Sequence, residues 1–117
     1  MADITAYTAG KNTAAVALLH KVRDKVLALG PIDERVHPSE VAWAGKRVFT
    51  SAFIVSNRLE LAIDLLRTVE HQQLREAFAT TKKVTTHRFW FDDAAQIDNA
   101  IFGWIAEAHD TVGPGTR

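Results

Sequence analysis

The chain contains no cysteine among its 117 residues. It therefore forms no disulfide, has no thiolate nucleophile and builds no cysteine zinc site. It also lacks excess charge of either sign, since 14 lysines and arginines match 14 aspartates and glutamates. A neutral chain has no overall attraction for nucleic acid, membranes or acidic ligands, so any such preference must come from a local patch.

Long apolar runs are missing as well. A membrane span needs about 18 consecutive apolar residues, whereas the apolar stretch Ala14 to Leu19 ends at His20. A secretory signal begins with basic residues, but here Asp3 precedes every lysine and arginine. These absences favour a cytoplasmic protein without a membrane partner.

Apolar content is what the chain does have. Hydrophobic residues make up 47% of it, which argues against disorder in a chain of zero net charge. Its length fits one domain, and no linker or repeat divides it. We expect a single domain over residues 1–117, with an ordered core at 7–110 and a tail at 111–117.

Helical signals lie near both ends. Asn12 to Leu29 repeats apolar side chains at spacings of three and four, and Gly30-Pro31 is a stop signal. A second long helix is expected to start at Asp93, which would cap it together with Gln96 in a capping box. A short helix is predicted over Glu70 to Ala79.

Strand signals lie between the helices. Lys46 to Val55 and Thr85 to Asp92 are rich in aromatic and β-branched residues. Val41 to Ala44 and Arg35 to His37 are shorter candidates. Leu59 to Leu66 alternates apolar and polar residues, which favours a half-buried strand over the helix that its composition would also permit.

The order of these elements predicts the fold class. Tight connections between successive strands favour antiparallel pairing. We therefore expect an α+β fold, a small antiparallel sheet of about four strands with two long helices on one face. Within Lys46 to Val55, Phe49 and Phe53 are expected to face the helices, which puts Thr50 and Ala52 on the outer face.

The strand Thr85 to Asp92 carries most of the candidate chemistry. Its alternation puts His87 on the core side, either as a buried neutral imidazole or as a general base at the mouth of the core. Arg88 and Trp90 then lie on the outer face. A tryptophan beside an arginine suits stacking on a planar ligand or on a partner's side chain.

Two plainer interpretations stand beside this one. The short helix over 70–79 would cover Trp90, or Arg88 would form an ion pair with Glu60 or Asp64 on a solvated surface. Either arrangement would make the outer face structural.

Basic residues indicate a second possible function. A basic patch with interleaved aromatic side chains is typical of proteins that bind single-stranded nucleic acid. The count here is modest and two aspartates, Asp92 and Asp93, are close by, so a solvated surface is the plainer interpretation. The basic residues are Lys46, Arg47, Arg58, Lys82, Lys83 and Arg88.

Tyr7 and Lys11 precede the first long helix. Helix N-termini attract anions, so both are candidate ligand contacts, and the alternative is that Tyr7 packs on the helix as a lid. His20 and Asp24 can share a helix face, but two ligands are too few for a metal site. No phosphate loop or nucleophile elbow occurs. We expect no metal, no cofactor and no catalytic residue, and we keep a small enzyme using His87 or Tyr7 as a third hypothesis.

Several short segments resemble a bacterial family. In their order and spacing, from Tyr7 to His109, they resemble the domain of unknown function 5655 family. The resemblance implies a small α+β domain, found alone or attached to other modules, some of them restriction-type nucleases, and supplies no mechanism. His109 stands where family members often carry tyrosine. The segments are Tyr7-Thr8-Ala9-Gly10-Lys11, Ala28-Leu29-Gly30-Pro31, Val41-Ala42-Trp43, Phe49, His87-Arg88-Phe89, Ile97-Asp98 and Trp104-Ile105-Ala106-Glu107-Ala108.

We therefore expect a protein of unknown function. The first hypothesis is a non-catalytic binding module whose outer sheet face, around Arg88 and Trp90, contacts a protein partner or a small ligand. The second is an accessory nucleic-acid-contacting domain. A homodimer through an exposed strand edge is compatible with these two hypotheses and with the small enzyme.

Overall fold

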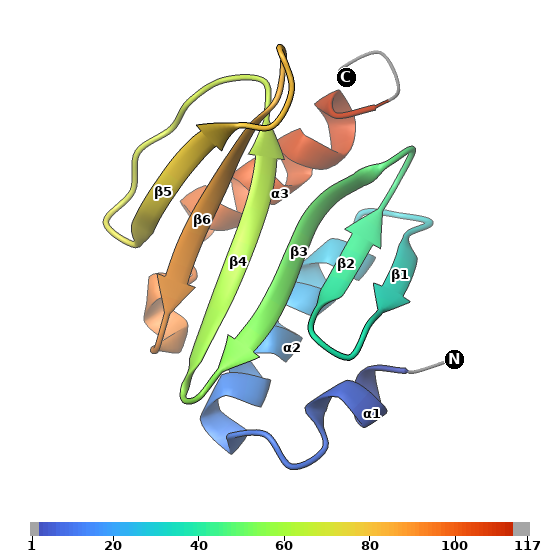
Figure 1. The fold of residues 1–117 in the computed structure, drawn as a ribbon, viewed down its shortest axis with the longest axis vertical. Helices are drawn as coiled ribbons and strands as arrows, with labels where there is room; N and C mark the ends of the chain where they lie inside the picture. The colour runs from blue at the N-terminus through green and yellow to red at the C-terminus, as the bar shows by residue number, and fades with distance from the viewer. Residues whose placement is uncertain (1–2, 114–117) are drawn as a thin grey trace.

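An antiparallel sheet forms the centre of the structure. The computed structural model describes residues 3–113, and its six strands follow the order β1-β2-β3-β4-β6-β5 (Figure 1). The expected α+β class and antiparallel pairing are confirmed, but the sheet has six strands rather than about four. The strands are β1 (Asp33–Val36), β2 (Val41–Ala44), β3 (Val48–Val55), β4 (Arg58–Leu65), β5 (Leu74–Ala79) and β6 (Thr85–Phe91).

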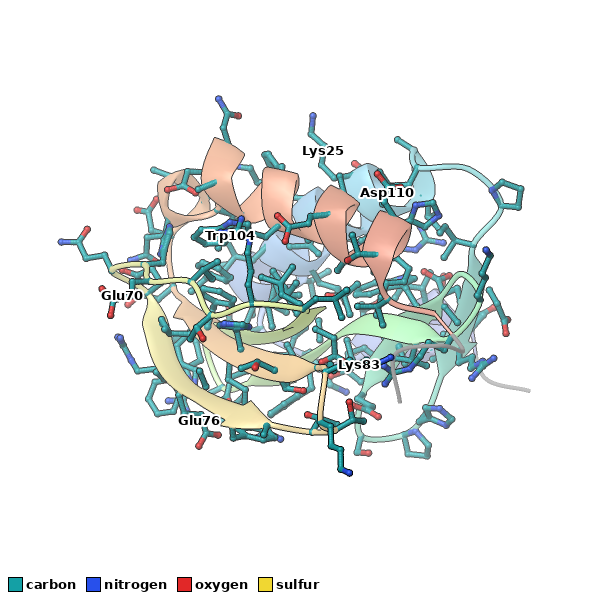
Figure 2. All side chains as sticks on the ribbon, turned by 90° about the horizontal axis from the view of Figure 1, so that it is seen from above. Lys25, Glu70, Glu76, Lys83, Trp104 and Asp110 are labelled. Carbon is teal, nitrogen blue, oxygen red and sulfur yellow. The ribbon has the colours of Figure 1, made fainter. Side chains whose placement is uncertain are left out.

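Two long helices pack on one face of this sheet. Figure 2 shows both long helices on the same side of the sheet. Two short elements, α1 and η1, were not expected. None of the helices in residues 3–113 has the length and apolar character needed to cross a membrane. The helices are α1 (Ile4–Thr8), α2 (Thr13–Leu27), the 3-10 turn η1 (Ala94–Gln96) and α3 (Asn99–Thr111).

The last long helix begins later than expected. Asp93 and Gln96 do form a capping box, but it caps the N-terminus of the 3-10 turn η1 rather than that of the long helix. The chain leaves helical geometry at Ile97, where ψ is 84°. Asp98 then accepts a hydrogen bond from the Ile101 N–H and starts α3. The expected helix start at Asp93 is therefore wrong, because a second cap five residues on begins the long helix.

The last long helix extends one residue past the expected core boundary at 110. α3 continues to Thr111, and Val112 is buried against the core. Both residues fall within the stretch expected to be a tail. Residues 114–117 lie outside the described residues.

The predicted short helix over 70–79 is wrong. Leu74–Ala79 forms β5, which pairs with β6 along the edge of the sheet. Residues 66–73 form an irregular connection from β4, in which Val69 is buried. Ladder hydrogen bonds to β6 outweigh the helix propensity of this segment. Trp90 is therefore not covered by a helix.

A bulge in β3 changes which residues face the core. The register between β2 and β3 shifts by one residue at Phe49. Phe49 is buried as expected, but beyond the bulge Thr50 and Ala52 are buried on the core face. Phe53 lies on the outer face, opposite Glu60. The expected orientation of Phe53, Thr50 and Ala52 is wrong because one extra residue inverts the alternation of a strand.

The core fills the space between the sheet and the two long helices. Strand residues of β2, β3, β4 and β6 meet the apolar stripes of α2 and α3, and burying such side chains is the main stabilising contribution to a domain of this size. The largest fully buried side chains are Trp43, Phe49, Phe89, Phe91, Leu19, Leu59, Leu61, Ile63, Leu65, Ile97, Ile101 and Ile105.

Candidate ligand-binding site

Trp90 is the centre of a candidate site on the outer face, the side of the sheet opposite α2 and α3. It is half-buried on β6, and Glu60 of β4 lies directly opposite in the ladder. The guanidinium carbon of Arg58 lies 4.0 Å from the ring centre, and that of Arg75 lies 5.4 Å from it. Both distances are within the range of cation–π contacts.

Arg75 reaches Trp90 because of a second bulge. The β5–β6 register shifts between Leu74 and Glu76, so Arg75 is the extra residue. Leu74 lies opposite Phe89 and packs against the core. Glu76 projects away from the helices (Figure 2). Because bulges re-aim side chains, Arg75 and Glu76 both reach the outer face, where strict alternation would separate them.

Two hollows border Trp90, and both are lined by Arg75. The first, the Arg88-side hollow, has a volume of about 370 Å³. The second, the Arg58-side hollow, has a volume of about 360 Å³. Trp90 therefore borders both hollows. The first is lined by Glu60, Arg75, Glu76, Arg88 and Trp90. The second is lined by Asn57, Arg58, Gln73, Arg75, Trp90, Phe91, Asp92 and Gln96.

Ion pairs neutralise most of the charge in the site. Arg58 contacts the Glu60 carboxylate through two nitrogens, at 2.9 and 2.8 Å. Arg88 meets Glu76 at the longer distance of 3.5 Å, and both of these side chains are about half exposed. Within residues 3–113, no carboxylate lies at ion-pair distance from Arg75. Arg58 and Arg88 are thus each paired with a glutamate, whereas Arg75 lies over the Trp90 ring without an ion pair in this part of the chain.

The expected alternative partners of Arg88 are occupied by other arginines. Glu60 pairs with Arg58, and Asp64 pairs with Arg47 at 3.4 Å. Burial raises the pKa of Asp64, although a hydrogen bond from Thr86 and the charge of Arg47 oppose this. Arg88 therefore forms its ion pair with neither of the two carboxylates that alternation suggested. Its partner is Glu76 of β5, a segment that the sequence predicted as a helix.

His87 lies on the opposite face, as expected from the alternation of β6. It is fully buried, and its Nε2 accepts a hydrogen bond from the Val69 N–H at 3.1 Å. Burial lowers the pKa of His87, and backbone groups of Ile63 and Thr85 oppose this only in part. The sheet separates this imidazole from Arg88 and Trp90, so it does not contribute to either hollow.

Tyr7 and Lys11 contact each other and lie apart from the site. Tyr7 is buried, and its hydroxyl accepts a hydrogen bond from the Ile54 N–H at 2.9 Å. Burial raises the pKa of Tyr7. Lys11 donates to the Tyr7 carbonyl at 2.7 Å and lies 4.3 Å from its ring centre. Neither residue lines a hollow beside Trp90. The hydrogen bond from Ile54 connects α1 to the end of β3.

The basic residues are engaged to different degrees. The Arg47 side chain is only 16% exposed and is directed towards Asp64. Lys82 and Lys83 lie in the connection between β5 and β6, and Lys46 precedes β3. Arg88 contacts Glu76. Arg47 therefore does not present its charge on a surface shared with Arg88.

A polar hollow of about 520 Å³ lies beside the N-terminus of α3. His71 lines it and holds the Asp98 carboxylate at 3.0 Å through Nε2, while its Nδ1 accepts from the Gln73 N–H at 3.0 Å. Burial favours a higher pKa for Asp98, but hydrogen bonds from His71 and Ile101 outweigh it and lower the pKa. Both ring nitrogens are engaged, so His71 ties the β4–β5 connection to α3 rather than offering a free base. Among the described residues, no group of three or more potential ligands could hold a metal ion.

Sequence reasoning missed Arg75 and Glu76. The segment Leu74 to Ala79 does not alternate apolar and polar residues, so no strand signal opposed its helix propensity. Arg58 was counted among the basic residues, but its place over Trp90 follows from the register of β4 with β6.

The fold and the site define a small α+β protein with helices on one sheet face and an arginine- and tryptophan-bearing opposite face. The model of the family described as Domain of unknown function (DUF5655) matches residues 4–112. The chain therefore belongs to this family, which confirms the resemblance seen in its sequence. Comparison with curated proteins gave no match, and neither did comparison with solved structures.

Proposed function

We propose that the protein is a non-catalytic binding module that holds its ligand on the outer sheet face around Trp90 and Arg88. The observation that carries this proposal is the position of Trp90 between two hollows of about 370 and 360 Å³. Small-molecule sites have volumes of roughly 300–1,000 Å³. Each hollow is therefore large enough for a small ligand or for a side chain of a partner.

The residue types of the site support binding rather than catalysis. Tryptophan and arginine are enriched among the residues that dominate binding energy. Arg58 holds one face of the Trp90 ring at 4.0 Å, which keeps the ring in a defined orientation. The histidine of the same strand lies on the opposite side of the sheet. That imidazole therefore does not reach the proposed binding surface.

Amide NMR with a fragment library of neutral, cationic and anionic compounds tests the proposal. We expect saturable shifts that cluster at Trp90 and Arg88 and at their neighbours on β4 and β5. Trp90→Ala is expected to remove these shifts while the rest of the spectrum stays native, because the ring is half-buried outside the core. Leu66→Ala removes an exposed apolar side chain that lines neither hollow and serves as the control. Unfolding of Trp90→Ala, or shifts that survive it, would contradict the proposal.

Nucleic-acid contact through Lys46, Arg47, Lys82, Lys83 and Arg88 has less support, because Arg47 is held by Asp64 and Arg88 by Glu76. This function would require an affinity for single strands that falls steeply with salt. A titration with a mixed-sequence oligonucleotide at low and high salt separates it from the first proposal.

A further inference from the structure

We infer that the ligand of the outer face is a planar anion, which places its ring in the Arg88-side hollow and its carboxylate or phosphate on Arg75. This inference rests on the proposed function and adds the chemical class of the ligand. It depends on the unequal charges around Trp90 and on which side of the ring each arginine occupies.

The register separates the arginines along β6. Leu59 lies opposite Phe91 and Glu60 opposite Trp90, so Arg58 lies beyond the ring in the direction of Asp92. Arg88 lies two residues from Trp90 in the other direction. Arg58 lines only its own hollow, and Arg88 lines only the other. A ligand in the Arg88-side hollow therefore meets Trp90 without meeting Arg58.

The charges of this hollow leave Arg75 in excess. The Glu60 carboxylate is held by Arg58 at 2.8 Å. Glu76 faces Arg88 at 3.5 Å, a half-exposed contact that contributes little energy and that a competing anion can displace. Arg75 has no carboxylate at ion-pair distance within residues 3–113. A ligand that enters the hollow therefore meets a guanidinium that lies over the Trp90 ring and is not held by a carboxylate of these residues.

Arginine also limits the kind of anion. The guanidinium group is planar and donates two parallel hydrogen bonds to a carboxylate or a phosphate. Arg75 lies 5.4 Å from the centre of the Trp90 ring. One molecule with an aromatic ring joined directly to an anionic group can therefore contact both side chains. A cationic ligand would meet the uncompensated Arg75, and a neutral ring would leave this charge without a partner.

The test compares probes that share a ring and differ in charge: indole-3-carboxylate, the neutral indole-3-carboxamide, and phenyl phosphate as the phosphate analogue. Amide NMR at low salt follows Trp90 and Arg75. We expect the carboxylate to bind at least about tenfold more tightly than the carboxamide, as is typical for a charge-assisted hydrogen bond. Phenyl phosphate is expected to shift the same amides. Added salt is expected to weaken binding of the two anionic probes and not that of the carboxamide.

Three variants assign the charge to its residue. Arg75→Gln is expected to weaken binding of the carboxylate about tenfold and to leave binding of the carboxamide unchanged. Arg75→Lys keeps the charge, loses the planar fork and should give an intermediate affinity. Arg35→Gln is the matched control, because Arg35 is a similarly exposed arginine on the far edge strand β1.

The possible failures are distinguishable. Equal binding of carboxylate and carboxamide at Trp90, unaffected by Arg75→Gln, overturns the anion inference and leaves the binding module standing. Loss of binding in Arg35→Gln as well as in Arg75→Gln also overturns it, since the attraction is then unspecific. If no probe binds while neutral fragments shift Trp90, only the ligand class is wrong. If no fragment shifts Trp90, the proposed function fails with it.

Discussion

At the residue scale, two histidines hold the irregular connection between β4 and β5. His87 accepts the Val69 N–H, and His71 accepts the Gln73 N–H. The buried His87 accepts through Nε2, which an imidazolium nitrogen cannot do. The order of the connection around Val69 therefore depends on a His87 imidazole that stays neutral.

The first prediction concerns pH. Because burial lowers the pKa of His87 below its usual value of 6.5, the unfolded chain binds a proton that the folded chain resists. Its stabilising contribution is complete above pH 6.5 and is lost progressively as the pH falls below that value. Urea unfolding at a series of pH values between 7 and 5 should show a falling free energy of unfolding.

His87→Gln is the matched variant for this measurement. Its amide oxygen can accept from the Val69 N–H but does not titrate. We expect a flatter dependence of stability on pH over the same range. If the variant and the original chain lose stability in parallel between pH 7 and 5, another group is responsible.

At the scale of the elements, the two bulges decide which side chains share a face. The bulge at Phe49 turns Phe53 outward, and the bulge at Arg75 brings that side chain over Trp90. Each follows from one residue that has no partner in the neighbouring strand. Small changes in register thus assemble the outer face.

Helix caps act at the same scale, and Asp98 gives the second prediction. Its carboxylate accepts from the Ile101 N–H and contacts His71, so it starts α3 and ties the β4–β5 connection to it. Asp98→Ala should cost about 0.5–2 kcal/mol of unfolding free energy. Asp98→Asn should cost less, because asparagine caps as well as aspartate does. Equal losses in urea titrations of both variants would show that charge, not capping, is what matters.

At the scale of the whole molecule, one carboxylate joins the sheet to the helical layer. Glu34 of β1 accepts from the Trp43 Nε1–H of β2 at 2.9 Å and from Arg23 of α2 at 2.6 and 3.0 Å. The hydrogen bond from Arg23 lowers the pKa of Glu34, against the effect of burial. The stabilisation of the fold by this ionised carboxylate is present at neutral pH. It is lost as the pH falls below 4.5, the usual pKa of glutamate.

The third prediction is that Glu34→Ala destabilises the fold by about 1–3 kcal/mol, because the buried Trp43 N–H loses its acceptor. The neighbouring change Asp33→Ala removes an exposed ion pair with Arg35 and should alter stability by no more than about 1 kcal/mol. Chemical unfolding of both variants checks the difference. A Glu34→Ala protein as stable as Asp33→Ala would mean that the sheet and α2 are held by apolar packing alone.

Strand alternation predicted part of the site from sequence. His87 faces the core and Arg88 and Trp90 face outward, as the pattern of β6 indicated. The pattern of Leu59 to Leu66 correctly favoured a strand over a helix. Both segments lie in the middle of the sheet with one buried face, where burial makes the period of two visible.

The sequence by itself determined the α+β class, the family and the two faces of β6, since these depend on local periodicity and on short motifs. Only the tertiary structure decided that Leu74–Ala79 is a strand and that Arg75 and Glu76 reach Trp90. The orientation of Phe53 was also decided there. Strand partners lie far apart along the chain, and a bulge depends on the register with a neighbouring strand, which neither propensity nor alternation within one segment encodes.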